Sequence, residues 1–173
     1  MFNHMKQKFP IIIGIVVLLV ASYFYLYPKL IQPPKPTEFK DVIITLERTA
    51  CYGFCPAYKL TIYGDGKIVY DGKYFVKTKG VQNSQIPTDK VKGLVDEFYK
   101  IDYFSLQDKY YAPVTDLPTT TTAITIDGKT KKVVNYYGAP EKLSELENII
   151  DEITNSKKWI GKCTSRLDET TCE

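Results

Sequence analysis

A run of 19 residues without a charge, Phe9 to Tyr27, constrains this chain more than any other feature of its sequence. An α-helix rises about 1.5 Å per residue, so a helix over this run is roughly 30 Å long, close to the thickness of the hydrocarbon core of a bilayer. Pro10 falls in the first turn, where a proline is tolerated. The run therefore predicts a transmembrane helix at residues 9–27, behind a tail of residues 1–8.

The residues that flank the run predict its orientation. Lys6 and Lys8 precede it, and cytoplasmic flanks favour Lys and Arg. Tyr23, Tyr25 and Tyr27 crowd its far end, as in the aromatic belt of a membrane interface. We therefore expect a single-pass membrane protein with a signal anchor, a cytoplasmic N-terminus and its main domain outside the cytoplasm.

A cleaved secretory signal peptide is the alternative. Val20-Ala21-Ser22 has the small residues of a cleavage site. The apolar run continues beyond that site to Tyr27, however, whereas the core of a signal peptide has about 7–15 residues. The length favours the uncleaved anchor. Both interpretations place the rest of the chain outside the cytoplasm.

The linker that follows, residues 28–38, is rich in proline. Pro28, Pro33, Pro34 and Pro36 favour an extended polyproline geometry, so the segment should be a semi-rigid spacer between membrane and domain.

Charge is distributed unevenly between the anchor and the domain. The net charge is +3, but Lys6, Lys8, Lys29 and Lys35 all lie before Phe39, and Glu38 is the one acidic residue there. From Phe39 onward the basic and acidic residues therefore balance. A neutral domain without a basic stripe argues against a nucleic-acid partner.

Residues 39–161 predict one extracytoplasmic α+β domain. β-Branched segments predict strands at residues 42–48, 57–63, 67–78, 119–126 and 131–137. Gly64-Asp65-Gly66 and Asp127-Gly128 are typical of hairpin turns, and Asp71-Gly72 indicates a further turn or a bulge. We expect an antiparallel sheet of hairpins with two amphipathic helices packed on one face.

The helices follow the two hairpins. Thr88 is the expected cap of a helix of about 14 residues, and Gly138 and Pro140 precede the second helix. Apolar residues at helical spacing predict their buried faces: Val91, Leu94, Val95, Phe98 and Ile101, then Leu143, Leu146, Ile149, Ile150 and Ile153. Because LTIYGDGKIVYDG and ITIDGKTKKVVNYYG are similar and each precedes a helix, the pattern suggests a duplicated ββα unit.

The four cysteines suggest disulfides outside the cytoplasm, and four cysteines allow three pairings. CYGFCPAY, residues 51–58, places Gly53 between Cys51 and Cys55, which permits a tight loop. Cys163 and Cys172 lie in a polar tail, residues 162–173, where they are able to close a second small loop. We expect the Cys51–Cys55 segment to be a structural loop ahead of a hairpin.

The string CYGFCPAY resembles the C-x-G-x-C-P-x-Y motif of an uncharacterised prokaryotic family, domain-of-unknown-function family 6438. The hairpin KLTIYGDGKIVYDG and the block TDLPTTTTAITIDGKTKKVVNYY are also similar to that family, so the resemblance covers roughly residues 39 to 160. It implies a domain and a set of family positions but no activity. Those positions are Cys51, Gly53, Cys55, Pro56, Tyr58 and Asp116.

Two other chemistries fit the paired cysteines less well. A thioredoxin-type pair has C-x-x-C at a helix N-terminus, whereas a strand is expected after Cys55. C-x-x-x-C-P also resembles the copper site of membrane-anchored copper-delivery proteins for cytochrome oxidase, but those need a histidine ligand, and His4 lies before the apolar run. A zinc site would need all four cysteines at unusual spacing. We therefore expect no metal and no cofactor.

Catalysis has little support in the sequence. A domain without histidine excludes Ser-His-Asp and Cys-His hydrolases, and no phosphate-binding loop is present. Asp116 is the best candidate acid, with Asp102 or Asp108 as its partner, although an Asp before Leu-Pro is more typical of a turn. We assign no catalytic residue.

Tyrosine makes up 14 of the 173 residues, which suits a recognition surface as well as half-buried strands. The expected function is non-enzymatic binding or assembly, with an envelope protein as the partner. The alternative is a thiol-based redox or copper-handling protein that uses Cys51 and Cys55.

Overall fold

The computed structural model of this protein describes residues 12–24, 32–166 and 169–172, in two units that divide between Pro34 and Lys35. In the first unit, residues 12–24 form a helix with exposed side chains. Within the described residues, no helix has both the length and the apolar character needed to cross a membrane. Residues 9–11 and 25–27 of the predicted span lie outside the described part of the chain.

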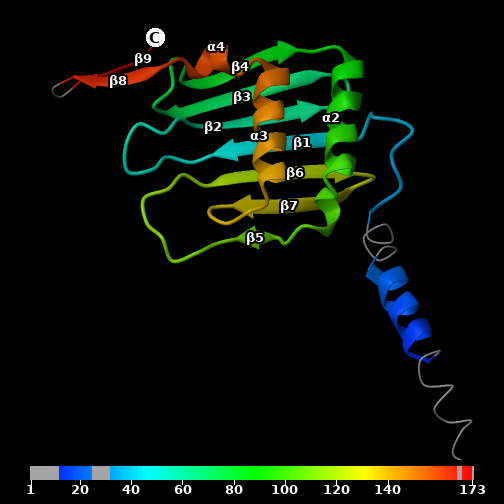
Figure 1. The fold of residues 1–173 in the computed structure, drawn as a ribbon. Coiled ribbons are helices and arrows are strands. Elements are labelled where there is room, and N and C mark those ends of the chain that lie inside the picture. The colour runs from blue at the N-terminus through cyan, green and yellow to red at the C-terminus, as the bar shows by residue number, and fades with distance from the viewer. Residues whose placement is uncertain (1–11, 25–31, 167–168, 173) are drawn as a thin grey trace, which may run out of the picture. The chain divides into compact units, whose positions relative to one another are not determined.

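A seven-stranded sheet forms the centre of the second unit (Figure 1). Its strands are β1 (Ile43–Arg48), β2 (Ala57–Tyr63), β3 (Lys67–Tyr74), β4 (Gly80–Gln85), β5 (Lys109–Tyr110), β6 (Thr120–Ile126) and β7 (Lys129–Asn135). Their order across the sheet is β4-β3-β2-β1-β6-β7-β5. Every neighbouring pair is antiparallel except β5 and β7, which are parallel. The prediction of a purely antiparallel sheet is wrong at this edge because β5 joins it without a hairpin.

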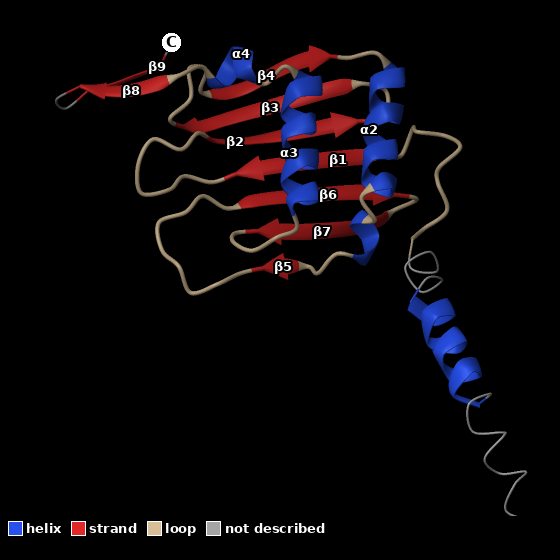
Figure 2. Ribbon diagram, in the orientation of Figure 1, coloured by secondary structure: helices blue, strands red, loops and turns tan. Residues whose placement is uncertain are grey.

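The helices cover one face of the sheet, as predicted (Figure 2). These are α2 (Thr88–Lys100), α3 (Glu141–Thr154) and the short α4 (Lys157–Ile160), with a 3₁₀ turn, η1, at Tyr103–Ser105. The predicted apolar face of α2 is buried throughout, and on α3 the buried apolar residues are Leu143, Leu146 and Ile150, with Ile149 and Ile153 partly buried. These faces meet the inward side chains of the central strands in one core.

The predicted hairpins form where glycine allows the backbone to turn. Gly66 has φ +89°, and a Cβ there would lie 2.0 Å from the Ile86 carbonyl oxygen. Asp127 and Gly128, between β6 and β7, both have positive φ. β1 lies between the β2–β3 and β6–β7 hairpins, each of which precedes a helix on the same face. The two halves differ, because β4 lies between β3 and α2, whereas no strand lies between β7 and α3. The duplicated ββα unit therefore remains a prediction.

Several local features differ from the prediction. Pro87, not Thr88, occupies the cap position of α2, and Thr88 is the first helical residue. β3 ends at Tyr74, and the expected irregularity near Gly72 is a bulge that leaves Lys73 without an opposite residue on β2. Residues 80–85 and 109–110 are strands that were not predicted.

The C-terminal tail is a hairpin rather than a simple loop. Cys163–Arg166 and Glu169–Cys172 form the antiparallel strands β8 and β9. Cys163 stands opposite Cys172 in this ladder, which places the two cysteines for the disulfide they form.

The sheet has two distinct ends. At the end where the chain enters β1, which we call the linker end, the Val42 amide donates to the Phe39 carbonyl and the Gly64 amide donates to the Val42 carbonyl. Lys35 forms an ion pair with Asp96 of α2 there. At the opposite end, the loop end, are the connections of residues 49–56, 75–79, 111–119 and 136–140 (Figure 1).

Candidate functional site

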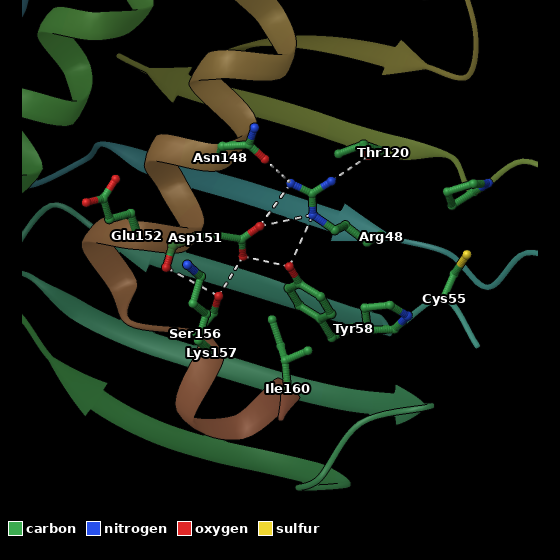
Figure 3. Close-up of a pocket in the computed structure, with 12 residues that line it drawn as sticks. Arg48, Cys55, Tyr58, Thr120, Asn148, Asp151, Glu152, Ser156, Lys157 and Ile160 are labelled. Carbon is green, nitrogen blue, oxygen red and sulfur yellow. Dashed lines mark hydrogen bonds and ion pairs between the residues drawn. The ribbon is translucent and has the colours of Figure 1, made fainter. Parts of the chain in front are cut away.

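A hollow that combines charged and apolar walls lies at the loop end, between α3 and the sheet. Its volume is about 480 Å³, within the range of small-ligand pockets, roughly 300–1,000 Å³. The residues that line it come from β1, β2, β6, α3, α4 and the loops between them (Figure 3). They are Arg48, Cys55, Pro56, Tyr58, Pro118, Thr120, Asn148, Asp151, Glu152, Ser156, Lys157 and Ile160.

Strand alternation places an arginine at the edge of the core. Ile44 and Leu46 point toward the helices, so Arg48, two residues further along β1, points to the same side. The register sets Arg48 directly opposite Tyr58 on β2 and Thr120 on β6. Three neighbouring strands therefore present polar side chains at the same height beneath α3.

An ion pair joins this row to α3. The Arg48 Nε and Nη2 atoms lie 3.0 Å and 2.9 Å from Asp151 Oδ2 (Figure 3). The two side chains are only 22% and 14% exposed. A pair with this degree of burial is costly to break, because either charge alone would remain away from water.

The second carboxylate oxygen of Asp151 is also fully engaged. Tyr58 Oη donates to Asp151 Oδ1 at 2.6 Å, and Ser156 Oγ donates to the same atom at 2.7 Å. The carboxylate thus accepts bonds from three side chains. Both of its oxygens are therefore occupied by partners within the protein.

Arg48 also contacts the strand beyond it and the helix above. Its Nη1 donates to Thr120 Oγ1 at 3.1 Å, and its Nη2 lies 3.5 Å from Asn148 Oδ1. We call Arg48, Tyr58, Thr120, Asp151 and Ser156 the polar clamp. It ties β1, β2 and β6 to the C-terminal half of α3.

Burial and charge fix the protonation of the clamp. Burial raises the pKa of the Tyr58 phenol far above its usual value, and the Asp151 carboxylate raises it further. Burial is the largest single influence on Arg48 and lowers its pKa, but the surrounding groups, led by the Asp151 carboxylate, together outweigh burial, and the net pKa is raised. Tyr58 therefore stays neutral and Arg48 stays charged across the physiological range.

A buried carboxyl group lies one helical turn before Asp151. Glu147 is 2% exposed, and its two carboxylate oxygens accept from Asn135 Nδ2 at 3.2 Å and 3.1 Å. Burial raises the pKa of Glu147 to about 7, against the Asn135 bond and the Arg48 charge, which lower it. Sequence analysis missed Glu147, although it lies four residues after Leu143 on the buried face of α3.

The disulfide loop forms one wall of the pocket. Cys51 is bonded to Cys55, which lines the pocket, and Gly53 between them has φ +148°. The second disulfide joins Cys163 and Cys172, so none of the four cysteines is free. The motif residues Cys55, Pro56 and Tyr58 all line the pocket.

The candidate acids are not brought to this site. Asp116 lies in an exposed loop with φ +70°, Asp108 pairs with Lys131, and Asp102 has φ +58° beside η1. None of the three lines the pocket. In the part of the chain that the structure describes, no three His, Cys, Asp or Glu side chains are grouped as a metal site would require.

The groups of the polar clamp bond to one another, and the pocket is also lined by two further charged side chains, Glu152 and Lys157, and by Pro56, Pro118 and Ile160. A ligand here would meet both charged and apolar walls.

Comparison with known proteins agrees with the sequence motif. A search of curated proteins finds no match. A family model described as "Domain of unknown function (DUF6438)" matches residues 42–154, which include β1 through α3 and thus most of the polar clamp. The chain belongs to this family.

Proposed function

We propose that this protein is a single-pass membrane protein whose domain lies outside the cytoplasm and acts as a non-enzymatic binding module. The apolar run at residues 9–27 supports the anchor, and its flanks support a cytoplasmic N-terminus. Two disulfides in one small domain support an oxidising compartment.

The observation that carries the binding proposal is the polar clamp beside an open pocket. Asp151 is bonded to three side chains, one of them its ion-pair partner Arg48, so the groups of the clamp support the fold. The pocket itself stays open at about 480 Å³. A polar clamp whose groups bond to one another, beside an open hollow, favours recognition over proton transfer.

Thiol labelling of the full chain tests location and disulfide state together. Spheroplasts would be treated with a membrane-impermeant maleimide, before and after a mild reductant. We expect no labelling before reduction and labelling of the cysteines after it, without lysis. Labelling that requires lysis would overturn the external location, and labelling without reductant would overturn the structural role of the disulfides.

A thiol-based redox or copper-handling role is the second candidate, because Cys55 lines the pocket. In the disulfide form neither sulfur offers the thiolate that such chemistry needs. Copper(I) titration of the reduced full chain separates the two functions. A binding module should take up no more copper than its Cys51→Ser variant, whereas uptake that is lost in Cys51→Ser supports the second candidate.

A further inference from the structure

Arg48 keeps a hydrogen-bond donor at the pocket that the clamp does not use. Asp151 Oδ2 accepts from its Nε and Nη2 atoms, and Thr120 Oγ1 accepts from Nη1. Each terminal nitrogen of a guanidinium carries two hydrogens. The second hydrogen on Nη1 has no acceptor among the residues that the structure describes, so the outer edge of the guanidinium retains a charged donor.

Two neighbouring side chains add donors at the same place. The Thr120 hydroxyl accepts from Arg48, and its own hydrogen has no acceptor within the described residues. Asn148 Oδ1 lies 3.5 Å from Arg48 Nη2, at the outer limit of a hydrogen bond, and in the described part of the chain the Asn148 Nδ2 hydrogens have no acceptor either. Figure 3 shows the terminal nitrogens of Arg48 between these two side chains. We call Arg48, Thr120 and Asn148 the donor corner.

The donor corner is complementary to a carboxylate. A carboxylate only accepts hydrogen bonds, and it does so through two oxygens, so it can engage several donors that converge on it. Bonds from a guanidinium to a carboxylate are among the stronger hydrogen bonds in proteins. Asp151 cannot take this role at the corner, because both of its oxygens already have partners.

The charges that line the pocket favour a ligand with a single negative charge. Arg48 and Asp151 pair with each other. Glu152 and Lys157 also line the pocket, are exposed, and have no side-chain partner among the described residues. The two cations and two carboxylates therefore balance. A phosphate group, with a charge of about −1.5 to −2, would meet more repulsion here than a carboxylate.

The remaining walls favour an apolar group next to the carboxylate. Pro56 and Pro118 line the pocket from the loops before β2 and β6, and Ile160 lines it from α4. Proline rings are rigid, so they lose little entropy when a ligand packs against them. The volume of about 480 Å³ suits a small molecule or the end of a chain.

We infer that the pocket binds a ligand with an α-carboxylate beside an apolar side chain, and that the donor corner holds the carboxylate. This inference rests on the proposed binding function and adds the ligand class and the residues that hold it. Two sources share this chemistry, the C-terminal residue of a peptide and a free amino acid. The ammonium group of a free amino acid would find an acceptor in Glu152, about one helical turn after Asn148 on α3.

Calorimetric titration of the full chain in detergent tests the ligand class with three probes. N-acetyl-leucine represents a peptide C-terminus, leucine is a free amino acid, and N-acetyl-leucinamide lacks the carboxylate. We expect at least one carboxylate probe to bind, and N-acetyl-leucinamide to bind at least tenfold more weakly. Tighter binding of N-acetyl-leucine assigns the pocket to a peptide end, and tighter binding of leucine assigns it to a free amino acid. Binding of neither carboxylate, or equal binding of the amide, would overturn the inference.

A pair of asparagine variants tests where the carboxylate is held. Asn148→Ala removes donors from an exposed side chain and should weaken binding of the tighter probe about tenfold, as expected for the loss of one hydrogen bond to a charged group. Asn83→Ala, at an exposed asparagine on β4 that does not line the pocket, should change binding less than twofold. The fluorescence of Trp159, the only tryptophan, shows that both variants fold. Equal effects of the two variants would overturn the assignment of the donor corner.

Failure of this inference is distinct from failure of the proposed function. If no probe binds while the thiol labelling and the copper titration give their expected results, the ligand class is wrong and the binding module is retained. Labelling without reductant, or copper uptake that is lost in Cys51→Ser, would instead count against the binding module itself.

Discussion

Glu147 offers a direct test of how α3 is held on the sheet. Its carboxyl group is 2% exposed, and its pKa is about 7 in the folded protein against an ordinary value of 4.5. The folded state therefore holds the proton more tightly than the unfolded chain. Stability from this group is fully present below about pH 4.5 and is lost as the pH rises through 7.

The magnitude follows from the size of the shift. One pKa unit corresponds to about 1.4 kcal/mol, so ionising Glu147 should cost about 3 kcal/mol of unfolding free energy by pH 8.5. Glu147→Gln keeps the shape of the side chain and removes the charge. We expect this variant to match the wild type near pH 4 and to be about 3 kcal/mol more stable at pH 8.5.

The chain provides its own reporter for this measurement. Trp159 is the only tryptophan, is buried, and stacks on Tyr70 with ring centroids 4.9 Å apart. Urea unfolding followed by its fluorescence would be run from pH 4 to pH 8.5. Glu145→Gln, on the exposed side of the same helix, is the control and should leave the pH dependence unchanged. A difference between Glu147→Gln and the wild type that does not grow with pH would refute the argument.

Four further substitutions test the clamp and the turns with the same fluorescence assay. Asp151→Asn leaves Arg48 buried without its counter-charge and should destabilise the protein by about 3 kcal/mol; no loss would mean that the pair is solvated. Tyr58→Phe removes the hydroxyl bonded to both charges and should cost about 1–2 kcal/mol; an unchanged midpoint would contradict the contact. Gly66→Ala, at positive φ and against a backbone carbonyl, should destabilise by more than about 1 kcal/mol, whereas Gly93→Ala, in open space on α2, should stabilise by about 0.5–1 kcal/mol. Equal effects at the two glycines would be inconsistent with the described turn.

Local chemistry made much of the fold predictable. Gly66 and Gly128 mark turns that few other residues allow, and the apolar spacing on α2 identifies its buried face correctly. These signals depend on neighbours in sequence. They also explain why the β2–β3 and β6–β7 hairpins were predicted with nearly the right bounds.

The strand β4 was missed because its sequence, GVQNSQ, has one β-branched residue and no apolar alternation. As an edge strand it buries little, and its place is set by the ladder with β3. The parallel pairing of β5 is likewise a property of the assembled sheet, since two residues carry no periodic signal.

The polar clamp could not be predicted from the sequence for a different reason. Arg48 and Asp151 are 103 residues apart in the sequence, and the residues around either one do not indicate that the two side chains form an ion pair. The motif that contains Tyr58 contributes one wall of the pocket, but it does not indicate that Arg48 and Asp151 contact Tyr58 there. Glu147 was not predicted either, although its position four residues after Leu143 places it on the predicted apolar face.

The position of β1 has a mechanical consequence. This strand continues directly from the linker, ends at the loop that carries Tyr52, and is paired along all six residues with β2 on one side and β6 on the other. A pull applied between the linker and the loop after β1 would act along β1. It would have to shear two ladders of hydrogen bonds together instead of opening one bond at a time. We therefore expect the domain to resist force in this direction far better than a pull applied across β4 at the edge of the sheet, and stretching single molecules along the two directions would measure the difference.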